Sequence, residues 1–457
     1  MVSRRQFVVA SAAALAGVRP CSAGGEHSAT VYRKALPLMC ETDVFIAGGG
    51  PAGIAAALAA SRSGARVFLA EASGAFGGAA TAAYVPALAT FSDGRRIVVG
   101  GIGREIRERV SQSLPLEGAW TMLDLEELKR VYDRLLVASG TEFSFFTNVV
   151  DVIAHEGHVE SVVVASKRGL LAVRANVYID CTGDGDLCAF GGGAFEKGDE
   201  KGGVMPTTLC SVWAGIDFSA DYPWPQSLLP KAIADGVFSV PDLHLPGVNR
   251  RPNGSVVGGG NVGHVFGVDP TDERSLTKAM VEARRRMVEY VRFYREYVKG
   301  HEKAELVGTA PCLGVRESRR IVCDYRLTVD DFLRRATFDD QIGRYCYPID
   351  LHASTSDEKA FSEFEKEYRE KYRYNPGESY GIPFRALIPR SFDNVLVAGR
   401  CIGSDRKMQA SVRVMPGCFI TGQAAGTAAA LAVAKRDVRS VNIDRLREIL
   451  KSSGAVL

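Results

Sequence analysis

The stretch that decides the fold is DVFIAGGGPAGIAAALAASRSGARVFLAE, residues 43–71. It opens with a short apolar run, 43–47, of the kind that forms a buried parallel strand. Glycines follow, then an alanine- and leucine-rich segment over 54–61, a second apolar run over 66–70, and the acid Glu71. The order strand, glycine turn, helix, strand, acid predicts a βαβ unit.

The glycines of this turn have the spacing G-x-G-x-x-G. Gly48 allows the tight turn, Gly50 lets main chain approach a pyrophosphate, and Gly53 lets the helix lie close to the sheet. The unpaired N–H groups at the helix N-terminus attract phosphate, and Glu71 can accept both ribose hydroxyls of an adenosine. The stretch therefore predicts a dinucleotide site, with a bare structural glycine turn as the alternative. Its predicted contacts are Gly48, Gly50, Pro51, Ala52, Gly53 and Glu71.

Three later segments decide between NAD and FAD. GAFGGAAT, residues 74–81, places a second glycine pair where a long dinucleotide would continue toward its ring. VYIDCTGDGDL, 177–187, is an apolar strand that ends in Thr-Gly-Asp-Gly-Asp, and NVLVAGRCIG, 394–403, is another that ends in Ala-Gly-Arg. A helix rich in small residues follows over 415–434, with a proline at its start.

This ordered set resembles the FAD-dependent oxidoreductases with a glutathione-reductase-type flavin fold. Within that group it is most similar to the family related to the flavin domain of heterodisulfide reductase A subunits. LGVRESRRIVCDYRLT (313–328), YPIDLH (347–352), GIPFRALIP (381–389) and AGRCIGSD with SVRVMPGC and GQAAGTAAA carry that similarity, which runs from about residue 41 to 434. The resemblance implies FAD as the cofactor, with further contacts at Gly77, Gly78, Ala79, Val150, Thr182, Gly183, Asp184, Gly399, Arg400, Pro416 and Gly417.

Two departures from the wider family matter. Many of its members carry an aspartate after the last Ala-Gly, and this chain has Arg400 there. The ten cysteines show neither C-x-x-C nor ferredoxin spacing, so a 4Fe-4S cluster would rest on the family name alone. We predict no metal site, mostly buried cysteines, and room for one or two disulfides whose pairing the spacing does not specify.

The N-terminus reads as an export signal. SRRQF, residues 3–7, places two arginines before a weakly apolar run over 8–17, which resembles a twin-arginine signal with cleavage near Ala23. That pathway implies the twin-arginine translocase as a partner and a periplasmic or extracytoplasmic location. The run is too short for a stable membrane span. A net charge of +3 gives no reason to expect nucleic acid as a partner.

The predicted fold class is α/β: a Rossmann-like FAD-binding domain with a β-meander, plus an inserted α+β substrate domain. An amphipathic helix over 123–140 and short β-rich runs over 143–147, 149–153, 159–165 and 170–173 precede the 177–187 strand. Helices are expected over 271–298, with an apolar stripe, and over 357–374, with a charged surface. The predicted divisions are signal 1–23, linker 24–40, FAD-binding domain 41–190 and 381–436, substrate or cap domain 191–380, and a tail helix in 437–457.

Candidate catalytic residues come from the histidines and arginines of the middle segment. His352, inside YPIDLH, is the preferred base, and His264 is a second candidate for the substrate site. His27, His155, His158 and His301 are expected in the linker or at the surface. Arg316 would clamp a carboxylate or stabilise negative charge, and Arg385 and Arg413 are further substrate candidates. The alternative for Arg316 is an ion pair with Glu317 or Asp324.

The function predicted from these residues is hydride transfer between a small organic substrate and N5 of the flavin. A sugar, a polyol or an organic acid fits as substrate, and oxygen, a quinone or a cytochrome fits as electron acceptor. Two alternatives stay open. One is a flavin subunit that relays electrons to a partner redox protein, and the other is an NAD-binding or non-catalytic module.

Overall fold

The computed structural model describes residues 33–111, 120–252 and 256–457, of which 37–457 form one unit. The predicted signal, residues 1–23, lies outside the described residues. The first strand, β1 (Leu38–Ala47), takes in the last three residues of the predicted linker. None of the described helices is both long enough and apolar enough to cross a membrane.

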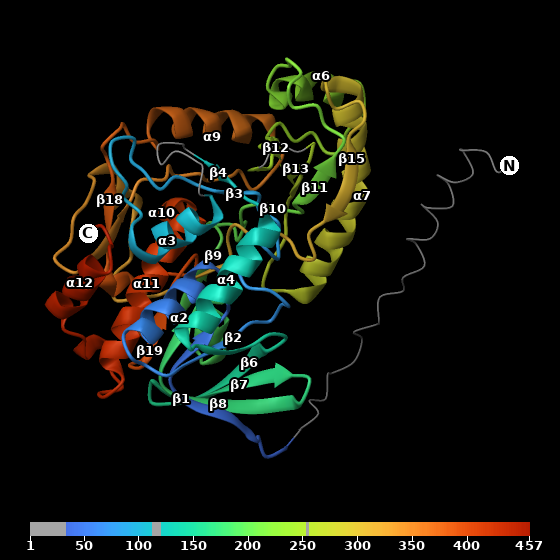
Figure 1. Ribbon diagram of the computed structural model, residues 1–457. Helices are drawn as coiled ribbons and strands as arrows, with labels where there is room; N and C mark the ends of the chain where they lie inside the picture. Colours follow the sequence, from blue (N-terminus) through green and yellow to red (C-terminus); the bar gives the residue numbers. More distant parts are fainter. Residues whose placement is uncertain (1–32, 112–119, 253–255) are drawn as a thin grey trace. The chain divides into compact units, whose positions relative to one another are not determined.

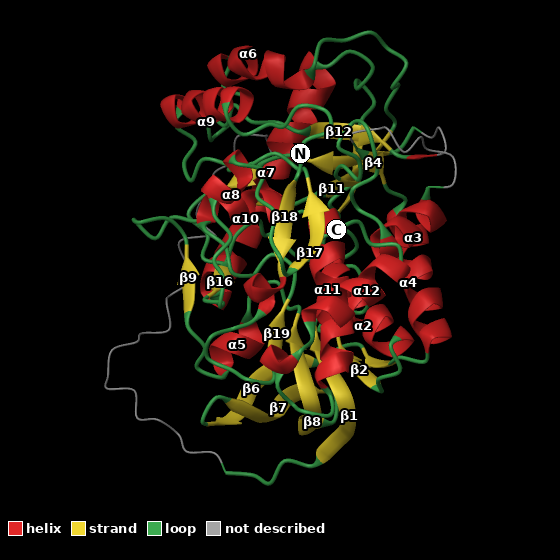
Figure 2. Cartoon of the chain, turned by 90° about the vertical axis from the view of Figure 1, so that its left-hand side faces the viewer, coloured by secondary structure: helices red, strands yellow, loops and turns green. Residues whose placement is uncertain are grey.

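The main sheet has the strand order β5-β2-β1-β8-β7-β6, with β19 (Val395–Val397) also paired to β8. β1, β2 (Val67–Ala70), β5 (Glu142–Ser144), β8 (Gly169–Asp180) and β19 run parallel, and β6 (Asn148–His155) and β7 (His158–Ser166) add an antiparallel meander (Figure 2). Helix α2 (Pro51–Arg62) joins β1 to β2, so the predicted βαβ unit and the α/β fold class are confirmed.

Strand β8 corrects one expectation, because the runs 170–173 and 177–180 form a single strand. Its first half pairs with β7 on one side, its second half pairs with β19 on that side, and β1 follows it along the other. The hydroxyl of Tyr178 accepts a hydrogen bond from the N–H of Ala175 at 2.9 Å and donates to the carbonyl of Glu160 at 3.0 Å. A side chain thus replaces a ladder partner where β7 gives way to β19.

Helix α11 (Met415–Ala432) packs directly against α2 (Figure 1). A Cβ built on Gly422 would lie 2.1 Å from the carbonyl oxygen of Ala52, and one on Gly426 would lie 2.1 Å from that of Ala56. The small residues predicted for this segment are therefore required by the helix contact. They bring the C-terminal part of the chain onto the glycine turn.

The helix predicted over 123–140 is α4 (Leu125–Ser139), whose leucine and valine stripe is buried. Asp124 caps its first turn, and Gly140 ends it with a φ of +72°. Near it lie α3 (Gly101–Val110) and a short pair of strands, β3 (Ala87–Leu88) and β4 (Thr121–Met122).

A second hydrophobic cluster draws its buried residues from 209–313. It lies between a four-stranded sheet, β12-β13-β11-β15, and α7 (Glu273–Tyr297) (Figure 1). Met287, Tyr294 and Val298 of the predicted stripe are buried there. Every residue of α9 (Glu358–Glu370) keeps at least partial exposure, which confirms the charged surface helix. The strands are β11 (Ser211–Ala214), β12 (Gly247–Arg250), β13 (Gly258–Asn261) and β15 (Glu305–Thr309).

Buried residues from 321 to 388 belong to the first cluster, with the sheet of β1, although the predicted substrate domain extends to residue 380. β17 (Gln341–Tyr345) pairs with β18 (Tyr380–Pro383) and lies against α11. The remaining elements are α5 (Asp186–Phe190), β9 (Phe195–Lys197), β10 (Thr207–Thr208), η2 (Pro225–Leu228), α6 (Leu229–Ala234), β14 (His264–Val265), β16 (Arg319–Ile321), α8 (Val329–Leu333), η4 (Phe384–Leu387), α10 (Arg406–Val412), η5 (Val438–Ser440) and α12 (Ile443–Ser452).

Candidate functional site

The turn between β1 and α2 is built from main chain that leaves no space for side chains. Gly48 has a φ of +93°, and a Cβ on it would lie 2.6 Å from the carbonyl oxygen of Cys181. A Cβ on Gly53 would lie 1.9 Å from the carbonyl oxygen of Gly48. Only glycine satisfies both positions. The turn is thereby held against the end of β8.

Open space lies beside Gly50 of this turn. A Cβ built on Gly50 would meet no atom of the described residues within 4 Å. Gly50 is the N-cap of α2, which begins at Pro51 with neither a side-chain cap nor an acidic residue in its first turn. The start of α2 therefore has neither a capping side chain nor a negative partner for its dipole, which is the arrangement that binds phosphate.

Glu71 is buried beside the turn. Its Oε2 accepts a hydrogen bond from the N–H of Gly49, and its Oε1 accepts one from the N–H of Ser73, both at 2.7 Å. Each oxygen keeps further lone pairs that can accept a ribose hydroxyl. The N–H of Gly77 donates to the carbonyl of Gly49 at 2.8 Å, so the second glycine pair, with Ala79 after it, follows the same turn.

The residues that follow β8 and β19 place a positively charged side chain, Arg400, at the site. Nη2 of Arg400 contacts Oδ1 of Asp184 at 2.6 Å, and the guanidinium lies over Gly183. Thr182 donates to Oδ1 of Asp180 at 2.7 Å and shapes this loop. The buried Nε of Arg400 has no hydrogen-bond partner among the described residues. A guanidinium thus stands at the position where the family resemblance leads us to expect an aspartate.

Helix α11 starts on the same side of the sheet. Its N-cap, Val414, gives no side-chain cap, Pro416 lies in its first turn, and a Cβ on Gly417 would lie 2.5 Å from the carbonyl oxygen of Val412. The N–H of Gly399 donates to Thr421 of this helix at 3.1 Å. Buried Oε1 of Gln409 and Nε of Arg413 also lack a hydrogen-bond partner in the described part of the chain.

The residues present fit FAD. Open main chain at an uncapped helix start suits the pyrophosphate, and Glu71 suits the adenosine ribose. The unpartnered polar atoms of Arg400, Gln409 and Arg413 offer hydrogen bonds beyond it. Val150 is more peripheral: it is exposed on β6, three residues after Thr147, whose N–H donates to the carbonyl of Glu71 at 2.9 Å.

Two predicted residues, His264 and His352, meet although 88 positions separate them. Nδ1 of His352 lies 3.1 Å from Nε2 of His264. The other ring nitrogens face carboxylates: Nδ1 of His264 lies 3.2 Å from Asp242, and Nε2 of His352 lies 3.3 Å from Asp350. Each histidine therefore has one nitrogen held by an acid and the other turned to its neighbour.

His244 completes a histidine cluster, defined here as His244, His264 and His352. Its ring stacks on that of His264 at a centroid distance of 5.1 Å and meets that of His352 edge-on at 4.7 Å. The cluster lines a cavity of ≈ 20 Å³ together with aromatic and small residues. That volume holds about one water molecule. Other lining residues are Asp242, Leu243, Phe266, Ala353, Thr355, Ser356, Phe361 and Phe364.

Burial sets the electrostatics of the cluster. It lowers the pKa of His244 to about 3 and lowers the pKa values of His264 and His352 as well. Burial alone would raise the pKa of Asp242, but the neighbouring His264 outweighs it and lowers that pKa to about 2. The pKa of Asp350 is likewise lowered, chiefly by His352, against the effect of burial. The three imidazoles are therefore neutral, and the two carboxylates beside them are ionised.

Two arginines border the cluster. Nη1 of the buried Arg316 donates to the carbonyl of Pro206 at 2.9 Å and to the hydroxyl of Thr208 at 2.8 Å. Burial and Arg413 lower the pKa of Arg316 to about 10, so it is charged at neutral pH. Nη2 of Arg413 donates to the carbonyl of Asp350 at 3.1 Å. Arg413 thus joins the segment of His352 to the start of α11.

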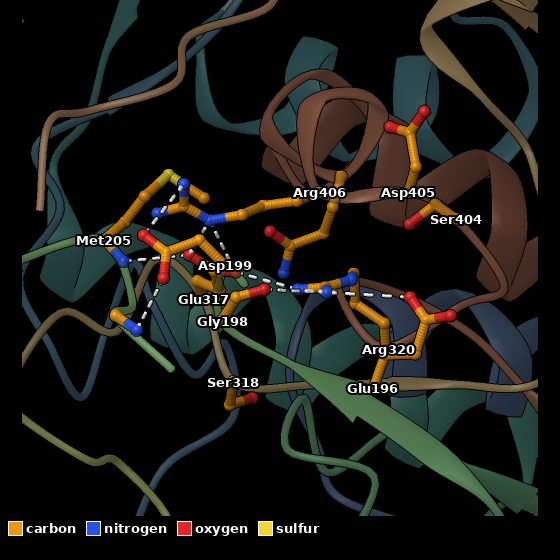
Figure 3. Close-up of polar contacts among 12 residues, drawn as sticks. Glu196, Gly198, Asp199, Met205, Glu317, Ser318, Arg320, Ser404, Asp405 and Arg406 are labelled. Carbon is orange, nitrogen blue, oxygen red and sulfur yellow. Dashed lines mark hydrogen bonds and ion pairs between the residues drawn. The ribbon is translucent and has the colours of Figure 1, made fainter. Parts of the chain in front are cut away.

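The two acids named in the alternative for Arg316, Glu317 and Asp324, pair with other arginines. Buried Glu317 accepts from the N–H of Met205 at 2.8 Å, from Nη1 of Arg320 at 2.8 Å and from Nε of Arg406 at 3.1 Å (Figure 3). This Glu317 network joins the strand pair β9–β16 to α10. Asp324 pairs with Arg439 at 3.0 Å. The side chain of Arg316 is left directed to Pro206 and Thr208.

Arg385 and His301 lie elsewhere than predicted, whereas the cysteines are mostly buried as expected. Arg385 forms an ion pair with Asp340 at 3.0 Å and lies over the ring of Tyr325, with its side chain 51% exposed. His301, expected at the surface, is buried and stacks with Tyr294. The nine described cysteines are all free, and seven are buried.

Sequence reasoning missed His244, Asp242 and Asp350 as site residues. Asp242 and His244 lie in an irregular segment of PDLHLPG, where no periodicity or motif marks a function. Asp350 does stand in YPIDLH, two residues before His352, and that proximity was the one available signal. The histidine cluster is also the group with metal-ligand geometry in the described residues, where the sequence predicted none.

Comparison with known proteins gives the family. The model of the FAD dependent oxidoreductases matches residues 43–450, so the chain belongs to this family. It is accordingly an enzyme, an FAD-dependent oxidoreductase, and FAD is its cofactor. A search of curated proteins found no match.

Solved structures of several flavoproteins are similar to this chain. A geranylgeranyl bacteriochlorophyll reductase-like protein from Thermoplasma acidophilum has 12% identity and a TM-score of 0.43, over 91% of this chain and 84% of that one. p-Nitrophenol 4-monooxygenase from Pseudomonas putida has 13% identity and a TM-score of 0.40, over 90% and 84%. The flavin-dependent brominase Bmp2 has 12% identity and a TM-score of 0.43, over 90% and 83%.

Proposed function

We propose that this oxidoreductase oxidises a CH–OH group of a small molecule, with a sugar, a polyol or a hydroxy acid as the substrate class. The observation that carries the proposal is the contact between Arg413 and Asp350. It places the histidine cluster beside the start of α11, the helix whose N-terminus we assign to the flavin ring. A polar substrate site and the cofactor site are then neighbours.

When bound, FAD would accept the hydride from the substrate carbon, and the hydroxyl proton would be released to water. The chain supplies the groups that hold the cofactor and the substrate. The glycine turn and α2 hold the phosphates, and the N-terminus of α11 favours negative charge near the ring. The ≈ 20 Å³ cavity has room for one oxygen atom, so the histidine cluster would hold the reacting hydroxyl while the rest of the substrate stays outside it.

Arg316 and Arg413 give the site its charge preference. Arg413 contacts Asp350 and retains an unpartnered, buried Nε within the described structure, and Arg316 carries its charge close to the same aspartate. A substrate that carries a carboxylate beside its hydroxyl would find donors there. This arrangement favours a hydroxy acid within the proposed class.

Anaerobic reduction of the bound flavin tests the proposal. Loss of the visible flavin absorbance is expected with at least one member of a panel of sugars, polyols and hydroxy acids. His352→Ala and Arg316→Ala should slow that loss at least about tenfold, since each removes a polar contact at the reacting group. Exposed His155→Ala and Arg168→Ala are the matched controls. If both site variants react at the parent rate, the substrate site lies elsewhere.

We also propose export by the twin-arginine route and a relation to the flavin domain of heterodisulfide reductase A subunits. The SRRQF segment supports the first, and the motifs near 313–328 and 381–389 support the second. Replacing both Arg4 and Arg5 with lysine should leave the folded, yellow protein in the cytoplasm, where cell fractionation would detect it. An unchanged distribution would contradict export by this route.

A further inference from the structure

The histidine cluster contains an unusual contact between two nitrogen atoms. Asp242 accepts from Nδ1 of His264, and Asp350 accepts from Nε2 of His352, so those two nitrogens carry the ring protons. The remaining nitrogens, Nε2 of His264 and Nδ1 of His352, then face one another at 3.1 Å with a lone pair each. Two lone pairs at this distance repel unless a cation lies between them.

We propose that His244, His264 and His352 bind one divalent transition-metal ion, and that Zn²⁺ fits the site best. One possible ligand nitrogen from each ring lies within 4.8 Å of the others. Two nitrogens that bind one tetrahedral Zn²⁺ at 2.0–2.1 Å are about 3.3 Å apart. The observed 3.1 Å between His264 and His352 is close to that value.

His244 supplies the third ligand. Its buried Nδ1 has no hydrogen-bond partner in the described chain, and its ring lies within 5.1 Å of both other rings by centroid distance. An unpartnered nitrogen in a buried site is costly when no ligand satisfies it. Coordination of an ion would satisfy all three facing nitrogens at once.

The carboxylates have the role of outer partners of a metal centre. A metal-bound histidine usually donates its other N–H to a carboxylate or carbonyl, which fixes the ring and raises its basicity. Asp242 and Asp350 do this for His264 and His352. Asp242 also accepts from the backbone N–H of His244 at 3.1 Å, so one acid fixes two of the three segments.

Charge and ligand type select the class of metal. The negative charges of Asp242 and Asp350 are balanced by Arg316 and Arg413 nearby. The ion is therefore held by imidazole coordination and not by a surplus of negative charge. Imidazole ligands suit Zn²⁺, Fe²⁺ and Co²⁺, whereas Mg²⁺ and Ca²⁺ require oxygen ligands.

Three protein ligands leave a fourth position open. The adjoining ≈ 20 Å³ cavity holds about one water molecule, which would occupy that position. On the proposed function, from which this role follows, the substrate hydroxyl replaces the water and is polarised by the ion. The metal site itself depends only on the three histidines and their acids.

Metal analysis of the purified FAD-bound protein tests the inference without any substrate. Elemental analysis after growth with Zn²⁺ should give about one ion per chain and per flavin. His244→Ala and His264→Ala should lose the ion and keep the flavin absorbance, which shows that they fold. His158→Ala, which removes a histidine paired with Asp393 on the sheet, is the matched control and should keep it.

A titration completes the test. Protein stripped with a chelator should bind added Zn²⁺ once, and added Co²⁺ should give visible bands at longer wavelength than the flavin. Asp242→Asn should weaken Zn²⁺ binding by about 10- to 100-fold. A flavin-replete parent that contains no metal and binds neither ion would overturn the proposal and leave a shared proton between His264 and His352. Failure of every substrate in the panel would leave this metal count unchanged.

Discussion

The glycine turn and the histidine cluster use different parts of the chain to bind a ligand. The turn uses main chain, and every Cβ at Gly48 or Gly53 would collide with a carbonyl oxygen. The cluster uses side chains from three separate segments, each oriented by an acid or by stacking. The turn is therefore part of the main-chain packing of the fold, whereas the cluster consists of side chains carried by that fold. Changes in the turn should cost stability, and changes in the cluster should cost binding.

The largest effect is expected at Gly53. Gly53→Ala places a methyl group 1.9 Å from the carbonyl oxygen of Gly48, and backbone must move to relieve the contact. We expect a loss of about 4 kcal/mol or more in the free energy of unfolding, measured by denaturant titration of the apoprotein. Gly50→Ala meets open space and should lose about 1 kcal/mol or less, yet bind FAD more weakly. Equal stability losses would contradict the described turn.

Glu317 is expected to contribute about as much to the free energy of unfolding as the glycine turn does, although it acts through side chains. Glu317→Gln leaves the buried Arg320 and the partly buried Arg406 without the carboxylate that they share. The free energy of unfolding should fall by about 3–5 kcal/mol. Glu196→Gln, which alters a partly exposed partner of Arg320, should cost about 1 kcal/mol or less. A Glu317→Gln protein as stable as the Glu196→Gln protein would refute this assignment.

A smaller effect is expected at Asp350, and it concerns binding. Asp350→Asn removes the carboxylate that accepts from His352, so Zn²⁺ affinity should fall by about 10- to 100-fold, as measured by competition with a chelating dye. Asp393→Asn alters a close histidine–aspartate pair outside the cluster, at His158, and should leave that affinity unchanged. An equal loss of Zn²⁺ affinity in both variants would show that the Asp350 carboxylate has no specific role in binding the ion.

The smallest effect is the pH dependence set by Asp186, close to the glycine-rich end of β8. Burial, with Asp184 and Asp180, raises the pKa of Asp186 to about 6, against the effect of Arg319. The folded state thus binds the proton more tightly than the unfolded chain. This contribution to stability is complete below about pH 4 and is lost as the pH rises through 6.

Asp186→Asn keeps a neutral side chain at every pH. The difference in unfolding free energy, variant minus parent, should therefore increase between pH 5 and pH 7.5 in denaturant titrations. Asp151→Asn, at an exposed position of β6, is the control and should show no such increase. A difference that stays constant or decreases would contradict the pKa shift of Asp186.

The contrast between the two regions also explains what the sequence could predict. The βαβ unit, α4, α7 and α11 follow from local spacing, because each depends on residues within about 30 positions. The sequence predicts two runs where β8 is one strand, because Arg174 and Asn176 interrupt the apolar pattern. The strand is supported by the hydroxyl of Tyr178, which accepts from the N–H of Ala175, and the pattern does not reveal this contact.

The site was predictable only in part for the same reason. His352 and His264 could be chosen by chemistry, but nothing local reveals that they meet, or that His244 joins them. Glu317 pairs with Arg320 and Arg406, whereas Arg316 donates to Pro206 and Thr208. Contacts across 20 to 100 positions are set by packing, which spacing does not encode.

The most direct test counts FAD and Zn²⁺ together in single preparations of the parent, Gly50→Ala and His264→Ala. We expect both ligands in the parent, a flavin-poor protein that still binds Zn²⁺ in Gly50→Ala, and a yellow protein without Zn²⁺ in His264→Ala. A correctly folded parent that stays colourless when FAD is supplied, or parallel loss of both ligands in each variant, would contradict this expectation.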